Sequence, residues 1–203
     1  MLFRMLIVDL DGTLVDCNSF TEFVKFLFRR YPQLRWRLAS VVLKRKLRLI
    51  SHHDAKERVV ALAEKCVDEK ALADFSEQLL HHVRQSLRDR IERADRVILA
   101  TAAPALYAVL FASMLGISEV CATEPGRGEN KGERKLRDVE RRGARFNAET
   151  VVITDHYDDL PLLKRNFAGK NILINPSAAT LMHANMAGIR FDVEVKVKDI
   201  RYR

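Results

Sequence analysis

The stretch MLIVDLDGTLVD, residues 5–16, ends an apolar run with two aspartates, Asp9 and Asp11, which are followed by Gly12 and Thr13. The nearly continuous apolar run at 3–10 is typical of a strand buried on both faces of a parallel sheet. A turn after such a strand needs only one Asp or Asn before its Gly. A plain turn is therefore one interpretation of the pair, and two catalytic carboxylates at the end of a strand are the other.

Four later segments also have the length and apolar character of buried strands, at residues 96–101, 118–123, 150–154 and 171–175. Helices are predicted between them at 104–115, 131–142 and 158–167, and the first two are followed directly by a glycine. This alternation predicts an α/β fold with a doubly wound, mostly parallel, Rossmann-like sheet. In such sheets the carboxyl ends of the strands carry the functional residues.

One long segment breaks the alternation. From residue 17 to residue 90 the apolar residues recur at helical spacing and no convincing strand is present. We therefore predict an all-helical insertion at 17–90 and a catalytic core made of 1–16 and 91–203.

The positive charge of the chain is concentrated in that insertion. The chain has 203 residues and a formal net charge of +8. The segment that begins at Lys25 and ends at Arg58 has 11 Lys or Arg and two acids, hence +9, so the remainder sums to about −1. Its apolar residues interleave with the cations, as in a helix that lies on an anionic membrane. The alternative is a lid whose charges attract a phosphorylated substrate. Nucleic-acid binding, with Trp36 and Tyr31 as stacking residues, is a weaker interpretation of the same charge.

The spacing of the cysteines and the length of the apolar runs bear on disulfides, zinc sites and membrane-spanning helices. The three cysteines are widely spaced and show no C-x-x-C pattern, which favours reduced thiols over disulfide or zinc sites. No apolar run approaches the ~18 residues expected of a membrane-spanning helix. We expect a cytoplasmic protein, with peripheral contact to the inner face of the membrane as the possible exception.

The aspartate pair suits phosphoryl transfer through an aspartyl-phosphate. Asp9 would attack phosphorus. Asp11 would protonate the leaving oxygen and then deprotonate the attacking water. A cation must separate a carboxylate nucleophile from a phosphate dianion, and Mg²⁺ prefers oxygen ligands. Asp155, which follows the segment 150–154, is the expected direct ligand, and Asp159 is expected to bind the metal through water.

The phosphoryl oxygens also need hydrogen-bond donors. Thr101 lies at the end of the segment 96–101, and its hydroxyl and the backbone of Ala102 are expected to face the phosphate. Lys131 follows a Gly-rich loop and is expected to neutralise charge on Asp9 and the phosphate.

The strings DLDGT (9–13) and DHYDDLPLL (155–163), with Thr101 and Lys131 between them, resemble the four motifs of the haloacid dehalogenase superfamily, in the right order. The surrounding strings resemble its phosphoserine-phosphatase-like branch, subfamily IB, which has a helical cap after the first motif. The resemblance implies Asp9 as nucleophile, Asp11 as acid/base, and Mg²⁺ held by Asp9, the Asp11 backbone carbonyl and Asp155. We also expect Gly12, Thr13 and Ala102 to bind the phosphate or substrate.

Two positions depart from that family pattern, His156 in place of a small residue and Thr154 in place of Gly. His156 is expected either to contact phosphate or substrate or to be a surface residue. The match to residues that recognise phosphoserine is incomplete. The substrate is therefore either a small phosphorylated metabolite or a lipid phosphate, since similar basic caps occur in phosphatidylglycerophosphate phosphatases. A membrane- or nucleic-acid-binding module with little turnover is the alternative function.

Overall fold

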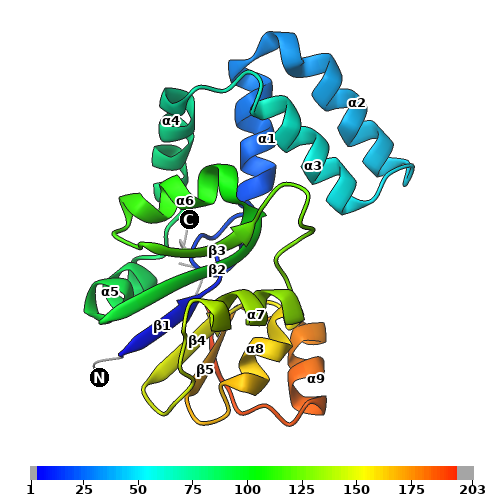
Figure 1. Ribbon diagram of the computed structural model, residues 1–203. Helices are drawn as coiled ribbons and strands as arrows, with labels where there is room; N and C mark the ends of the chain where they lie inside the picture. Colours follow the sequence, from blue (N-terminus) through cyan, green and yellow to red (C-terminus); the bar gives the residue numbers. More distant parts are fainter. Residues whose placement is uncertain (1–3, 196–203) are drawn as a thin grey trace, which may run out of the picture.

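Six parallel strands form one sheet in the computed structural model, which describes residues 4–195 (Figure 1). Residue 3, where the first predicted strand begins, lies outside the described residues. The spatial order is β3-β2-β1-β4-β5-β6, which confirms the predicted Rossmann-like α/β class. The strands are β1 (Met5–Val8), β2 (Arg96–Pro104), β3 (Glu119–Thr123), β4 (Thr150–Thr154), β5 (Lys170–Ile174) and β6 (Asp192–Glu194).

The sheet is buried on both faces because its central strands are largely apolar. Every residue of β1 and of β4 is buried. Successive side chains of a strand point to opposite faces. Leu6 and Val8 accordingly join one core cluster, and Met5 and Ile7 join the other.

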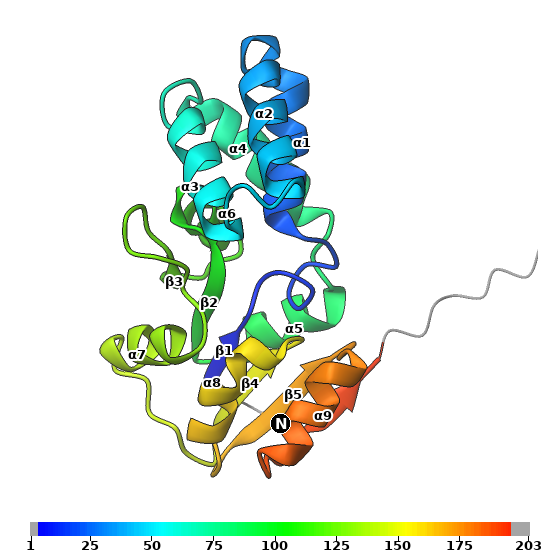
Figure 2. The ribbon, with the colours of Figure 1, turned by 90° about the vertical axis from the view of Figure 1, so that its right-hand side faces the viewer.

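Helices cover both faces of this sheet. On one side lie α5 (Gln85–Arg93) and α6 (Ala105–Met114), and on the other lie α7 (Glu133–Arg141), α8 (Leu160–Arg165) and α9 (Ala178–Met186) (Figures 1 and 2). The chain also contains two short 3-10 helices, Pro32–Leu34 and Tyr157–Asp159. The helix α9 and the strand β6 were not predicted from the sequence.

The segment between β1 and β2 is helical, as predicted. It contains α1 (Ser19–Arg30), α2 (Arg35–Lys46), α3 (His52–Ala63), α4 (Glu69–Leu80) and then α5. The first three lie beyond the carboxyl ends of the strands, whereas α5 runs along the sheet (Figure 1). The predicted boundary at residue 90 falls inside α5. The division of the chain into a core and a cap domain stays a prediction.

An aromatic cluster joins the insertion to α6, which covers one face of the sheet. Tyr107 of α6 is fully buried, with its ring centroid 5.0 Å from that of Phe23 in α1 and 5.2 Å from that of Phe75 in α4. Its hydroxyl lies 3.1 Å from the hydroxyl of Ser19, the first residue of α1. Burial raises the pKa of Tyr107 well above its ordinary value, so the phenol stays neutral. This cluster fixes the start of α1 next to the loop that follows β1.

Among the described residues, no helix is both long enough and apolar enough to cross a bilayer. The three cysteines are free thiols.

Candidate active site

A cleft of about 340 Å³ opens where the strands β1, β2 and β4 end. Its walls come from both the sheet and the insertion. The lining residues are Asp9, Asp11, Asn18, His52, Lys56, Ala102, Glu129, Lys131, Lys135, Asp155, His156, Asp158 and Asp159.

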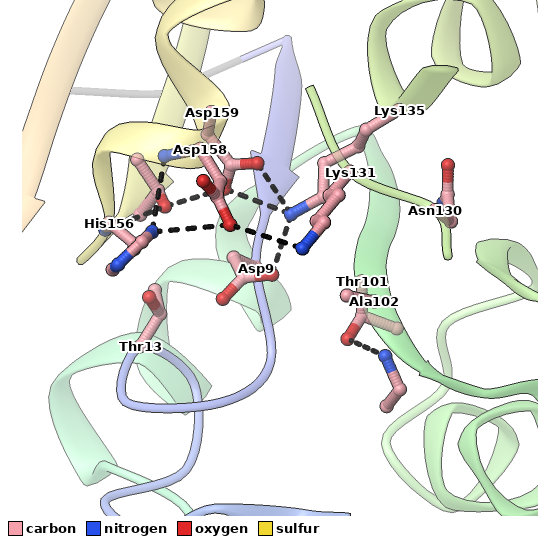
Figure 3. A network of polar contacts seen from close by, with 12 residues as sticks. Asp9, Thr13, Thr101, Ala102, Asn130, Lys131, Lys135, His156, Asp158 and Asp159 are labelled. Carbon is pink, nitrogen blue, oxygen red and sulfur yellow. Dashed lines mark hydrogen bonds and ion pairs between the residues drawn. The ribbon is translucent and has the colours of Figure 1, made fainter. Parts of the chain in front are cut away.

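A buried lysine lies between two carboxylates in the floor of the cleft (Figure 3). Lys135 is only 3% exposed, and its Nζ donates to Asp9 Oδ1 at 2.9 Å and lies 2.7 Å from Asp159 Oδ1. Asp159 also accepts a hydrogen bond of 2.6 Å from the Thr154 hydroxyl. The ammonium group of Lys135 is thereby held against Asp9, and Asp9 is fixed in turn.

The negative charge in this cluster exceeds the positive charge. Burial raises the pKa of Asp9 to about 8; Lys135 opposes this shift, whereas Asp159 and Asp155 add to it. Burial also raises the pKa of Asp155. For Lys135, burial lowers the pKa, but Asp159 and Asp9 outweigh burial and the net shift is upward. A further cation beside Asp9 and Asp155 would favour their ionised forms.

The donor set fits a hard divalent cation. Asp9, Asp11 and Asp155 all line the cleft and offer only oxygen. Within residues 4–195, no three acidic, histidine or cysteine side chains come together as a group that could hold a metal ion. Mg²⁺ is commonly bound by one or two carboxylates, with water and substrate phosphate as its other ligands, so a partial protein set suits it. Asp159 contacts Lys135 and Thr154, and its role as a water-mediated ligand stays a prediction.

The start of α1 holds the second aspartate. The backbone N–H of Ser19 donates to Asp11 Oδ1 at 2.6 Å, and Asn18 caps the same helix. A carboxylate is favoured at a helix N-terminus, where free N–H groups and the helix dipole meet it. This contact orients the Asp11 carboxyl group at the edge of the cleft.

Gly12 and Thr13 shape the loop that carries the aspartates. Gly12 has φ +72, and a Cβ at this position would lie 2.3 Å from Asp155 Oδ2. The Thr13 hydroxyl donates to Asp155 Oδ1 at 3.4 Å, and Arg84 donates to the carbonyls of both Gly12 and Thr13. Neither residue lines the cleft, so their predicted contact with phosphate stays a prediction, and their observed role is to seat Asp155.

Replacing Gly12 by alanine is expected to lower the free energy of unfolding by about 2 kcal/mol, through the left-handed backbone and the clash with Asp155. Displacement of Asp155 should also raise the Mg²⁺ concentration for half-maximal activity at least about tenfold. Gly116→Ala is the matched control, because Gly116 has φ +73 and no atom within 4 Å of the added Cβ. An equal Mg²⁺ requirement in both variants, measured by Mg²⁺ titration of activity, would contradict this role of Gly12.

Thr101 does not lie at the end of a strand. The strand β2 continues to Pro104, and its pairing with β3 shifts register between Ala100 and Pro104. Thr101 is fully buried, and its hydroxyl accepts the Ala103 N–H at 2.9 Å. The predicted position at a strand end is therefore wrong, and the predicted contact of the Thr101 hydroxyl with phosphate stays a prediction. Its neighbour Ala102 does line the cleft, as predicted.

Lys131 is not the lysine that contacts Asp9. The helix α7 begins at Glu133, two residues later than the sequence suggests, and Gly132 with φ +58 lies between Lys131 and that helix. The Lys131 ammonium lies 3.0 Å from Glu129 and 3.9 Å from Asp158, at the mouth of the cleft (Figure 3). The predicted position beside Asp9 belongs to Lys135, one helical turn further on.

A buried ion pair connects the insertion to the wall of the cleft. Lys56 of α3 lies 2.7 Å from Glu129 and donates to the carbonyl of Ala102 at 3.3 Å. Burial would raise the pKa of Glu129, but the hydrogen bonds and charges of Lys56 and Lys131 outweigh it and bring the pKa to about 2. This ion pair holds α3 over the cleft.

We expect Glu129→Gln to lower the free energy of unfolding by about 3 kcal/mol at neutral pH, because the folded state favours the ionised form. The pKa of Glu129 falls from 4.5 to about 2 on folding, so its contribution is complete above pH 4.5 and disappears as the pH falls toward 2. Urea unfolding across this range measures the effect. Glu124→Gln, at an exposed ion pair with Arg127, is the control. A constant difference between Glu129→Gln and wild type at all pH values would exclude this explanation.

His156 lies at the mouth of the cleft. Its ring stacks on Tyr157 with the centroids 4.1 Å apart, and its Nδ1 accepts the N–H of Asp158 at 3.1 Å. The histidine therefore caps the turn after β4 and lines the cleft. Its predicted contact with phosphate or substrate stays a prediction.

Sequence reasoning missed Lys135, Lys56 and Glu129. For Lys135 a signal exists: it lies four residues before Val139, and these two are the buried residues of α7. A lysine in phase with the apolar face of a helix is unusual. For Lys56 and Glu129 no local pattern exists, since they meet only through the packing of α3 on the loop after β3.

The comparisons with known proteins agree with this geometry. The family model of the haloacid dehalogenase-like hydrolases matches residues 6–164. Among curated protein sequences, none matches the chain.

Several solved structures share the fold. A protein of unknown function from Bordetella pertussis Tohama I is 21% identical, with a TM-score of 0.71, and the match covers 94% of this chain and 98% of that one. A phosphoserine phosphohydrolase-like protein from Francisella tularensis subsp. tularensis SCHU S4 is 16% identical, with a TM-score of 0.57 and 94% of each chain covered. A phosphoserine phosphatase, solved as a phospho-aspartyl intermediate analogue, is 13% identical, with a TM-score of 0.54 and coverage of 99% and 97%.

At these identities the structures establish a shared fold, and the family model establishes membership over most of the chain. The chain belongs to the haloacid dehalogenase-like hydrolase family.

Proposed function

We propose that the protein is a Mg²⁺-dependent phosphomonoester hydrolase that works through an aspartyl-phosphate on Asp9. The observation that carries the proposal is the fixed position of the Asp9 carboxylate. It lies in the wall of a cleft, 2.9 Å from the buried Lys135 ammonium, with Asp11 two residues further along the same loop.

In the proposed reaction Asp9, Asp11 and Lys135 have different roles. An Asp9 oxygen forms a bond to phosphorus as the bond to the ester oxygen breaks, and that oxygen takes its proton from Asp11. Asp11 then removes a proton from water, whose oxygen attacks the phosphorus and releases inorganic phosphate and the Asp9 carboxylate. Lys135 neutralises charge around Asp9 throughout. When bound by Asp9, Asp155 and the Asp11 backbone, Mg²⁺ would screen the phosphate charge from the attacking carboxylate.

The second aspartate favours an oxygen leaving group. Ester cleavage expels an alkoxide that needs a proton, and Asp11 is oriented by Ser19 to supply one. Cleavage of an alkyl halide would need no such acid. The two solved structures named as phosphoserine phosphatase or its relative make phosphoserine a reasonable first substrate. The cations Lys56 and Lys131 in the cleft suit other anionic phosphate esters equally well, including lipid phosphates.

The test is phosphate release from phosphoserine and from a phosphatidylglycerophosphate in mixed micelles, each with Mg²⁺ and with a chelator. We expect turnover of at least one ester that the chelator abolishes and added Mg²⁺ restores. Turnover that is indifferent to the chelator would contradict the role of the metal. No turnover across a broad panel of monoesters would favour a binding module that keeps the fold.

A further inference from the structure

The outward face of α2 has an apolar centre. Leu38 and Val41 are the buried residues of this helix and pack toward the insertion. Each residue advances the helix by about 100°, so Trp36 and Leu43 lie opposite that buried side. Trp36 is 87% exposed and Leu43 is 54% exposed, and Leu47, just after the helix on the same line, is 59% exposed. A helix face turned to water normally carries charge at this position.

Cations flank this apolar line on both sides. By the same geometry Arg35 and Lys46 lie on one side of it, and Arg37 and Lys44 lie on the other. All four are exposed. None of them forms an ion pair with an acidic residue within the part of the chain that the structure describes, whereas Lys25 and Arg30 of α1 do. Arg35 donates to the carbonyl of Phe28 at 2.9 Å and lies over its ring, but no acidic side chain of the described residues neutralises the positive charge around Trp36.

The helix is placed where a flat partner can reach it. In both views α2 lies at the outer end of the insertion, away from the sheet (Figures 1 and 2). A surface that met this face would touch neither the strands nor the helices that cover them.

We propose that the outward face of α2, formed by Trp36, Leu43 and Leu47 with their flanking cations, docks on an anionic phospholipid membrane. Tryptophan favours the boundary between lipid and water, leucine gains from burial, and the cations are attracted by acidic headgroups. Nucleic acid would use the charge but would leave the two leucines exposed. A second copy of the chain would bring the same unpaired cations together. The proposal stands independently of the reaction at Asp9.

Trp36 is the only tryptophan of the chain, so tryptophan fluorescence reports on the environment of this face. Wild-type protein is mixed with vesicles of phosphatidylcholine alone and with vesicles of equal parts phosphatidylcholine and phosphatidylglycerol. We expect a blue shift of Trp36 emission only with the anionic vesicles, and quenching by brominated lipid. High salt should weaken the partitioning.

Variants of α2, compared with variants of exposed residues elsewhere, distinguish membrane binding by this face from nonspecific binding by any exposed residue. Lys44→Gln/Lys46→Gln should reduce partitioning on the order of 30-fold, at about fivefold per cation. Leu43→Ser/Leu47→Ser should reduce it at least about tenfold. Phe167→Ser and Lys164→Gln change exposed residues at the distant α8 end and should leave partitioning unchanged. All of these positions are exposed, and circular dichroism verifies that each variant is folded.

Three outcomes would overturn the proposal. The first is Trp36 emission that does not change with anionic vesicles, or changes equally with neutral ones. The second is a response to single-stranded RNA or DNA in the absence of any response to vesicles, which would assign the face to nucleic acid. The third is a blue shift that appears without lipid as protein concentration rises, which would assign it to self-association.

Discussion

Asp9→Asn is expected to reduce Mg²⁺-dependent phosphate release at least about 10⁴-fold, because the amide cannot act as the nucleophile that accepts the phosphoryl group. Asparagine is nearly isosteric with aspartate and can still accept a hydrogen bond from Lys135. The loss should therefore appear in kcat for every ester that the wild type hydrolyses. Residual turnover within tenfold of wild type would show that another group performs the attack.

The stability of the same variant distinguishes lost chemistry from lost folding. The pKa of Asp9 rises from 3.8 to about 8 on folding, so the folded state holds this proton more tightly than the unfolded state does. The free energy of unfolding of the metal-free wild type should therefore fall as the pH rises from about 4 toward 8. The asparagine side chain of Asp9→Asn carries no charge, so the variant should be at least as stable as wild type at pH 8. Thermal unfolding at the two ends of this pH range measures the difference.

Lys135→Met is expected to lower kcat/KM by about 10²–10³, because it removes the ammonium group that faces Asp9. Lys131→Met is the matched control and should cost less than about tenfold, since its ammonium lies on Glu129 and Asp158. Comparison of the two variants shows which of the two lysines contributes to catalysis. A large loss in Lys131→Met together with a small loss in Lys135→Met would reverse the assignment.

Removal of Lys135 also affects folding, since it leaves the Asp159 carboxylate buried without a counter-charge. Asp9 adds no charge at neutral pH, because its pKa of about 8 keeps it protonated in the metal-free protein. We expect a loss of about 3–5 kcal/mol in the free energy of unfolding. The double variant Lys135→Met/Asp159→Asn removes the unpaired carboxylate and should recover part of that stability without recovering activity. Recovery of both would mean that Lys135 acts only through the stability of the fold.

The sequence was sufficient to predict β1–β5 because these strands form short, largely apolar runs. The run at 150–154 became β4 without change, and the alternation of strand and helix led to the correct class of fold. The same logic placed Asp9 and Asp155 at one edge, since both follow central parallel strands. Two small elements escaped prediction: β6 has only three residues, and α9 lacks a regular apolar stripe.

Lys131 was assigned to the position that Lys135 occupies because the start of α7 was predicted two residues too early. The pattern 131–142 placed Lys131 on α7, but Gly132 adopts a left-handed conformation and the helix begins after it. Lys135 then takes the inward position, in phase with Val139. Thr101 was misplaced for a related reason, since β2 extends past it through an irregular register. The contact between Lys56 and Glu129 depends on how the insertion packs on the core. No local sequence pattern predicts that packing.

The central claim is that the phosphoryl group passes through Asp9, and trapping the phosphoenzyme tests it most directly. The enzyme is mixed with a radiolabelled phosphate ester and Mg²⁺, quenched in acid within the first turnover, and digested for peptide mapping. We predict label on the peptide that contains Asp9, and none in Asp9→Asn. Phosphate release by the wild type with no label on that peptide, at any quench time, would contradict the account.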